Sequence, residues 1–162
     1  MTAEKNANLA QKVARCASDR DLTVAVAESL TSGLLVSALG AADDASVWLR
    51  GGVVAYATAV KQKVLGVSPG PVVSARCAEE MAAGVAAQLD ADAAVATTGV
   101  GGPDSEEGHE PGTVYIGWWV HGQVGSRLYD FDGTPEEVLE ATVAAALTDL
   151  LGAMDAAERG ES

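Results

Sequence analysis

The chain has 162 residues, of which 48% are hydrophobic and 4% aromatic, and its formal net charge is −13. This length suits one domain over residues 1–162, and we place its core at about residues 5–154. A surface this acidic, with no cluster of Lys or Arg, excludes nucleic acid as an expected partner.

The N-terminal residues 1–8 are polar, and no apolar run is long enough to span a bilayer. We therefore expect no membrane association and a cytoplasmic location. The two cysteines, Cys16 and Cys77, have no partner at metal or redox spacing, which suits a reducing compartment. His109 and His121 also have no second ligand at metal spacing, so we expect no metal and no cofactor.

Helical spacing of apolar residues and short β-branched runs alternate in the first two thirds of the chain. Gly40 and Gly66 are typical helix stops, and Ser74 is a typical helix cap. The segment 41–46 is polar and is expected to be a loop. The predicted helices cover residues 4–19, 34–39, 59–65 and 75–89, and the predicted strands cover residues 22–27, 50–57 and 93–97.

The last third begins with a strand over residues 113–120, and Gly122 allows a hairpin into a strand over 124–131. Trp118 and Trp119 point to opposite faces of this strand, so we expect one of them to be exposed, as in a homo-oligomer. A capping box and a proline at residues 134–137 open the last helix. We expect this helix to end near Met154 and the polar tail beyond it to be disordered.

This order of elements predicts an α/β fold, a three-layer α/β/α sandwich with a mixed, mostly parallel sheet. Ligands of such folds bind where loops leave the strand ends. The expected ligand cleft therefore lies at the loops that follow the strands.

The turn from Glu28 to Gly33 joins a predicted strand to a predicted helix and carries several hydroxyl groups. Free amides at a helix N-terminus and the helix dipole favour an anion such as a phosphate. The alternative is that Thr31 or Ser32 only caps the helix. A second candidate is the loop over residues 97–103, whose glycines could form an anion nest or an oxyanion hole. The alternative there is an ordinary flexible loop.

Ser46, Tyr56 and Lys61 form the third candidate. A serine needs a base to take its proton, and a lysine can be that base when burial lowers its pKa. Lys61 stands among apolar residues, and Tyr56 could hydrogen-bond the pair or the substrate. The alternatives are a helix cap for Ser46, a solvated charge for Lys61 and an edge-strand aromatic for Tyr56.

Several motifs, taken in order, resemble the C-terminal domain of the competence- and damage-inducible CinA proteins, which also occurs as the stand-alone nicotinamide mononucleotide deamidase. The resemblance covers about residues 5–152. The motifs are Ala27-Glu28-Ser29-x-Thr31-x-Gly33, Arg50-Gly51-Gly52-Val53-Val54-Ala55-Tyr56, Lys61 with Leu65-Gly66-Val67, Thr98-Gly99-Val100-Gly101-Gly102-Pro103 and Pro111-Gly112-Thr113-Val114-Tyr115.

The resemblance implies a metal-independent serine–lysine amidohydrolase that converts nicotinamide mononucleotide to nicotinate mononucleotide and ammonia in pyridine nucleotide recycling. The family's nucleophile falls on Ser46, its base on Lys61 and its site tyrosine on Tyr56. Either the turn or the glycine loop would hold the phosphate of this small-molecule substrate. The residues that would bind the substrate are Glu28, Ser29, Thr31, Gly33, Thr98, Gly99, Gly101 and Gly102.

The chain departs from the family pattern around the expected dyad. An asparagine usually found between Tyr56 and Lys61 is absent, and Gly133-Thr134-Pro135 stands where the family carries Gly-Asp-Arg. A missing arginine weakens the capture of a phosphate. The alternative function is therefore a catalytically weakened member that binds a nucleotide or acts as an interaction protein in a competence or damage response.

Overall fold

The computed structural model describes residues 2–160 and has a five-stranded sheet with the order β2-β1-β3-β4-β5. The strands are β1 (Val24–Glu28), β2 (Leu49–Val54), β3 (Ala93–Gly99), β4 (Thr113–Val120) and β5 (Gln123–Asp130). Strand β1 pairs in parallel with β2 and β3, whereas β4 is antiparallel to both β3 and β5. The predicted α/β fold with a mixed sheet is confirmed, and its parallel pairings lie among β2, β1 and β3.

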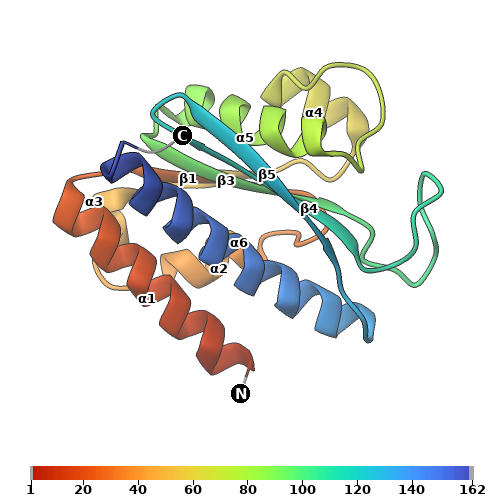
Figure 1. Cartoon of the computed structure of the whole chain (residues 1–162), viewed down its shortest axis with the longest axis horizontal. Helices are drawn as coiled ribbons and strands as arrows, with labels where there is room; N and C mark the ends of the chain where they lie inside the picture. The colour runs from red at the N-terminus through yellow and green to blue at the C-terminus, as the bar shows by residue number, and fades with distance from the viewer. Residues whose placement is uncertain (1, 161–162) are drawn as a thin grey trace.

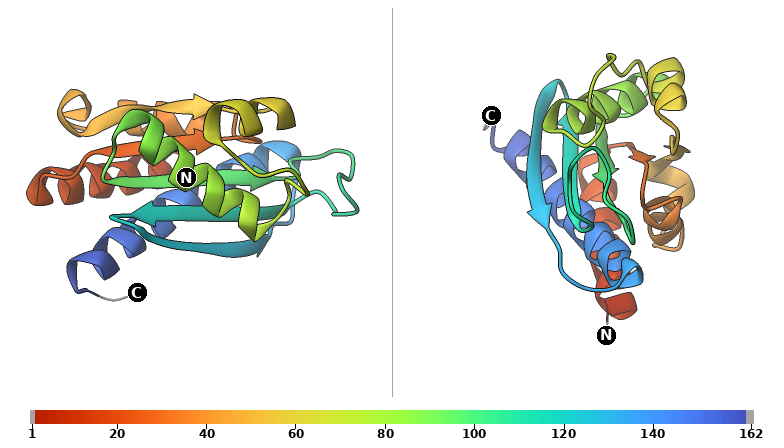
Figure 2. Two further views of the ribbon diagram at one scale, coloured as in Figure 1. Left: turned by 90° about the horizontal axis from the view of Figure 1, so that it is seen from above. Right: turned by 90° about the vertical axis from the view of Figure 1, so that its right-hand side faces the viewer.

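Helices cover both faces of this sheet, as Figures 1 and 2 show, so the predicted three layers are also confirmed. Helices α4 and α5 pack on one face, and the other four helices pack on the opposite face. The bounds are α1 (Thr2–Arg20), α2 (Leu34–Gly40), α3 (Ala45–Trp48), α4 (Thr58–Leu65), α5 (Ala75–Leu89) and α6 (Pro135–Glu158).

The core consists of two apolar clusters, one on each face of the sheet. On β1, Val24 and Val26 join the cluster under α1 and α6, while Ala25 and Ala27 join the cluster under α5. Every residue of β1 is buried, because successive side chains point to opposite faces and both faces are covered. The small alanines let α5 pack close to the strands.

Several boundary predictions were wrong. The strand predicted over residues 50–57 ends at Val54, so Tyr56 follows the strand. The segment 41–46 was predicted to be a loop, but α3 begins inside it at Ala45. The last helix continues to Glu158 rather than ending near Met154. Arg20 holds this extra turn through ion pairs of 2.7 Å with Asp155 and with Glu158. Of the predicted disordered tail, residues 161–162 lie outside the described residues.

Neither tryptophan of β4 is fully exposed. Trp118 is half-buried against the first cluster, and Trp119 is half-buried against the second. The expected exposed tryptophan is therefore absent from β4. Among residues 2–160, no helix combines the length and the apolar character that crossing a membrane requires.

The parallel strands bring three connecting segments to one end of the sheet. The turn after β1, the segment between β2 and α4, and the loop after β3 all leave the carboxyl ends of their strands. The loop after β3 projects beyond the sheet, and the N-terminus of α6 lies at the same end (Figures 1 and 2). Any ligand site formed by these segments lies at this edge, as predicted for open α/β sheets.

Candidate active site

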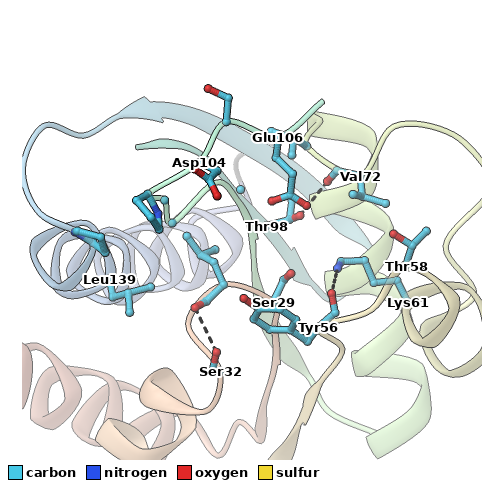
Figure 3. Close-up of a pocket in the computed structure, with 18 residues that line it drawn as sticks. Ser29, Ser32, Tyr56, Thr58, Lys61, Val72, Thr98, Asp104, Glu106 and Leu139 are labelled. Carbon is cyan, nitrogen blue, oxygen red and sulfur yellow. Dashed lines mark hydrogen bonds between the residues drawn. The ribbon is translucent and has the colours of Figure 1, made fainter. Parts of the chain in front are cut away.

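A cavity of about 440 Å³ opens at the carboxyl ends of the parallel strands. This volume falls within the range of small-molecule sites. Its walls come from the turn after β1, from α4, from the loops after α4 and β3, and from the start of α6 (Figure 3). Its polar lining residues include Ser29, Tyr56, Lys61, Thr98, Asp104 and Glu106.

Lys61 lies on α4 and is only 2% exposed, although it lines the cavity. Its Nζ donates to the main-chain oxygen of Tyr56 at 2.9 Å. Burial lowers the pKa of Lys61, and the acidic side chains of Glu106 and Glu107 only partly oppose that effect. A buried lysine with a lowered pKa gains the neutral form, which can accept a proton.

Ser29 follows the last residue of β1 directly and also lines the cavity. Its backbone N–H donates to Oγ1 of Thr97 on β3 at 3.3 Å, which fixes the turn against the sheet. Figure 3 shows Ser29 and Lys61 on neighbouring walls of the same cavity. A serine hydroxyl therefore shares the cavity with a lysine that is suited to be its base.

The structure does not bring Ser46 and Lys61 together, so the predicted pair is corrected. Ser46 lies on α3, which precedes β2, whereas Lys61 lies on α4, which follows β2. The six residues of β2 separate them by about 20 Å at about 3.3 Å per residue. Figure 1 shows α3 and α4 at opposite ends of the sheet. Ser46 is exposed and does not line the cavity.

Glu28 was predicted to bind substrate, but its carboxylate serves the fold instead. The side chain is fully buried, and it accepts the backbone N–H groups of Gly33, Leu35 and Val36 at 2.9–3.2 Å. These are the amides that a helix N-terminus leaves unpaired. Glu28 therefore caps α2 from inside the protein.

That cap also removes the helix-terminal amides from the predicted phosphate site at residues 29–33. The amides of Gly33, Leu35 and Val36 are occupied by Glu28, and the backbone N–H of Leu34 donates to the main-chain oxygen of Thr31. Thr31 is fully buried, and its hydroxyl is 2.9 Å from that of Thr97. Neither Thr31 nor Gly33 lines the cavity. The predicted capping alternative, by Thr31 or Ser32, is also wrong, since Glu28 supplies the cap.

Tyr56 and Thr98 do line the cavity, as the sequence predicted. Tyr56 is 69% exposed, so its ring forms part of the rim rather than the floor. Thr98 is buried and donates through Oγ1 to the main-chain oxygen of Val72 at 2.8 Å. This hydrogen bond ties the end of β3 to the loop that forms the opposite wall, so Thr98 shapes the cavity through its backbone and methyl group.

The glycine loop lines the cavity through Gly99, Gly101 and Gly102. Within the described chain, the backbone N–H groups of Gly101 and Gly102 make no hydrogen bond. The loop is not free, because the carboxylate of Glu107 accepts the backbone N–H groups of Val72 and Val73 at 2.7–3.1 Å. The glycine loop is therefore held across the cavity with backbone donors available to a ligand.

The cavity holds one basic side chain, Lys61, and two acidic ones, Asp104 and Glu106. No arginine lies on its walls as far as residues 2–160 are concerned. Across the same residues, no three His, Cys, Asp or Glu side chains gather as a metal site requires. The polar groups of the cavity are thus hydroxyls, one amine, two carboxylates and backbone amides.

Ser29 was assigned to substrate binding from sequence, and its place on the same cavity as Lys61 was not linked to a nucleophile's role. The available signal was its position: a serine directly after a buried strand and before a helix presents its hydroxyl at the strand end, where ligands bind. Asp104, Glu106 and Leu139 also line the cavity and were not predicted. Leu139 lies on α6, which is distant in sequence, so only the fold brings it here.

Residues 6–154 match the family model described as the CinA C-terminal domain. The protein YdeJ of Escherichia coli (strain K12) is 40% identical over 136 residues, which cover 80% of this chain and 79% of YdeJ. A protein of Geobacillus kaustophilus (strain HTA426) named "Putative competence-damage inducible protein" is 48% identical over 111 residues, or 65% of this chain. The matched part is only 27% of that longer relative.

Solved structures of similar proteins share the whole fold. A CinA superfamily protein from Klebsiella pneumoniae 700603 matches with a TM-score of 0.89 and 32% identity, over 93% of this chain and 98% of that one. A second CinA superfamily protein, from Escherichia coli, matches with a TM-score of 0.88 and 37% identity, over 90% of this chain and 88% of that one.

Proposed function

We propose that this chain, which belongs to the CinA C-terminal domain family, is an amidohydrolase that acts on the carboxamide of nicotinamide mononucleotide or a close relative. The observation that carries the proposal is the placement of Ser29 and the buried Lys61 in one cavity at the strand ends. Ser29 takes the nucleophile's role that the motif comparison gave to Ser46.

In the proposed reaction, the neutral Nζ of Lys61 accepts the proton of the Ser29 hydroxyl as Oγ attacks the carboxamide carbon. The tetrahedral intermediate collapses as Lys61 passes this proton to the nitrogen, and the C–N bond breaks to release ammonia. Water then attacks the acyl-serine ester with Lys61 as base again. The products are the carboxylate and ammonia, and the serine is restored.

Two sets of backbone donors are available to the oxyanion of the intermediate. The N–H groups of Leu30 and Thr31 follow Ser29 directly and, over the described residues, make no hydrogen bond. The N–H groups of Gly101 and Gly102 lie in the loop on another wall. Preorganised donors of this kind typically contribute about 3–4 kcal/mol each to the lowering of the barrier.

The test is ammonia release from nicotinamide mononucleotide by the purified protein and three variants. We expect Ser29→Ala and Lys61→Ala each to lose at least about a thousandfold in kcat/KM, since neither nucleophile nor base can be replaced by the solvent. Ser46→Ala is the matched control, because it removes the same hydroxyl about 20 Å from Lys61. Loss of activity in Ser46→Ala with retention in Ser29→Ala would contradict the proposed dyad.

A second candidate is a member that binds a nucleotide without turning it over. Its support is that the described lining residues include no guanidinium, so no arginine is available to stabilise the negative charge that develops during the reaction. Two measurements on the purified protein distinguish the two functions. If calorimetry detects binding of the nucleotide, but no carboxamide of a small panel releases ammonia, this candidate is favoured.

A further inference from the structure

We infer that the preferred substrate is a pyridinium carboxamide nucleoside, with a cationic aromatic ring and no phosphate, rather than the corresponding nucleotide. This inference rests on the proposed amidohydrolase function. Three observations support it. The cavity walls carry acidic side chains, the nearby arginine and helix N-terminus are already hydrogen-bonded within the protein, and the ring of Tyr56 is exposed.

The charge of the cavity is negative when the enzyme acts. Lys61 is its one basic lining residue within residues 2–160, and it must be neutral to accept the proton of Ser29. Asp104 and Glu106 then remain as two uncompensated carboxylates on the wall formed by the loop after β3. A phosphate dianion meets repulsion from both of them, whereas a pyridinium ring is attracted.

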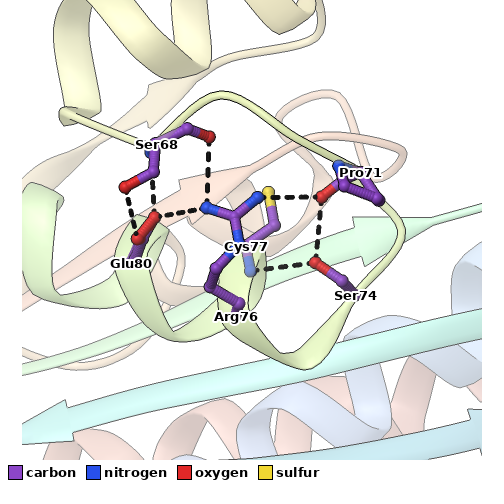
Figure 4. A network of polar contacts seen from close by, with 6 residues as sticks. All are labelled: Ser68, Pro71, Ser74, Arg76, Cys77 and Glu80. Carbon is purple, nitrogen blue, oxygen red and sulfur yellow. Dashed lines mark hydrogen bonds and ion pairs between the residues drawn. The ribbon is translucent and has the colours of Figure 1, made fainter.

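Arg76, the arginine nearest in sequence to the wall residues Val72 and Val73, does not supply the missing cation. Its guanidinium donates to Glu80 at 2.7 Å and to the main-chain oxygens of Ser68 and Pro71 at 3.1 and 3.2 Å (Figure 4). These bonds hold the loop between α4 and α5. Arg76 therefore has a structural role, and it does not line the cavity.

The N-terminus of α6 is the other feature that would attract a phosphate, because Pro135 lines the cavity. This terminus is already capped. The hydroxyl of Thr134 accepts the backbone N–H of Glu137, and the carboxylate of Glu137 accepts the backbone N–H of Thr134. The two carboxylates of the first turn, Glu136 and Glu137, also complement the helix dipole from within the chain.

The remaining walls suit a cationic ring. The ring of Tyr56 is largely exposed at the rim, where it can stack on a pyridinium with a cation–π contribution. Leu30, Pro103 and Leu139 provide apolar surface on the facing walls. A ring held between these groups with its positive charge toward Asp104 and Glu106 has no need of a phosphate anchor.

The experiment compares kcat/KM for nicotinamide riboside and nicotinamide mononucleotide, which differ only in the phosphate. We expect the riboside to be favoured by at least about tenfold, or about 1.4 kcal/mol. The double variant D104N/E106Q removes both carboxylates and should bring the ratio toward one. D43N/D44N is the matched control, since it neutralises two exposed carboxylates beside α3, at the far end of the sheet. Raising the salt concentration should improve the mononucleotide more than the riboside.

The outcomes separate this inference from the proposed function. Preference for the mononucleotide, with a ratio that D104N/E106Q leaves unchanged, overturns the inference and leaves the amidohydrolase intact. If no amide is hydrolysed, the amidohydrolase fails, and calorimetry with the wild type and with Ser29→Ala still decides the inference. Tighter binding of the riboside than of the mononucleotide supports it, and equal, weaker or absent binding overturns it.

Discussion

The carboxylate of Glu28 accepts the backbone N–H of Leu35 at 2.9 Å, across the turn that carries Ser29. Together with the bonds to Gly33 and Val36, it fixes the start of α2 relative to β1. We predict that Glu28→Gln lowers the free energy of unfolding by about 1.5–3 kcal/mol, because the amide keeps one acceptor and places an N–H₂ group against backbone donors. Urea unfolding of the two proteins measures this loss.

Glu140→Gln is the control for this change, because Glu140 is exposed on α6. It should alter the free energy of unfolding by less than about 0.5 kcal/mol. In Glu28→Gln we also expect kcat to fall under conditions where the variant is folded, since Ser29 follows Glu28 directly. A variant that is as stable and as active as the wild type would show that the cap does not position the nucleophile.

The lowered pKa of Lys61 predicts how the rate depends on pH. The base must be neutral, so kcat/KM should rise tenfold per pH unit and level off at a pH below 10.5, the ordinary value for lysine. Initial rates of ammonia release between pH 6 and 10 would give this profile. A rate that falls as the pH rises through this range would exclude Lys61 as the base.

The same shift predicts a pH dependence of stability. Between the lowered pKa of Lys61 and 10.5, the unfolded chain carries a proton on this group that the folded chain does not. The contribution of Lys61 to stability therefore rises with pH across this window. Lys61→Met should be more stable than the wild type at neutral pH, and the difference should shrink toward pH 10.5. Thermal unfolding at several pH values checks it, with the exposed Lys63→Met on the same helix as the control.

The fold was largely predictable because its signals are local. Three such signals each depend on only a few neighbouring residues. They are the alternation of side chains between the two faces of the strand over residues 113–120, the capping box at Thr134 and the glycines that end helices. The end of α6 at Glu158, which the sequence did not predict, depends instead on ion pairs with Arg20, more than 130 residues away in the chain. Such a contact leaves no local pattern.

The site was predictable only in part, for the same physical reason. Lys61, Tyr56, Thr98 and the glycine loop were identified by motif, and the structure places them around one cavity. Which serine accompanies Lys61 depends on the direction of β2, which carries the chain from α3 at one end of the sheet to α4 at the other. The family resemblance assigned the nucleophile to Ser46, whereas the parallel sheet places Ser29 on the cavity that Lys61 lines.

Glu107 is predicted to hold the glycine loop over the cavity. Its carboxylate accepts the backbone N–H groups of Val72 and Val73, so Glu107→Ala leaves two donors without their partner. We expect faster hydrogen exchange at the amides of Val72 and Val73 and a KM raised several-fold, because the wall that carries Asp104 and Glu106 loosens. Exchange followed by nuclear magnetic resonance and steady-state kinetics give both values.

The matched control is Glu110→Ala, which removes an exposed carboxylate from the same loop. It should leave exchange at Val72 and Val73 unchanged. If both variants alter KM alike while exchange stays slow, the effect comes from the lost charge, and Glu107 does not act as a latch.

Gly84 sets how closely α5 approaches the helix that carries Lys61. A Cβ at this position would overlap the main-chain oxygen of Leu65, the last residue of α4. In Gly84→Ala the two helices must therefore separate, which we expect to cost about 1–3 kcal/mol of the free energy of unfolding.

Gly152→Ala on α6 is the matched control, since nothing lies within 4 Å of its added Cβ. That change should stabilise the protein by about 0.5–1 kcal/mol, because alanine loses less backbone freedom on folding. Urea unfolding separates the two, and kcat/KM should fall only in Gly84→Ala, where α4 moves together with its base. Equal stability of the two variants would mean that α4 and α5 leave room for a Cβ at residue 84.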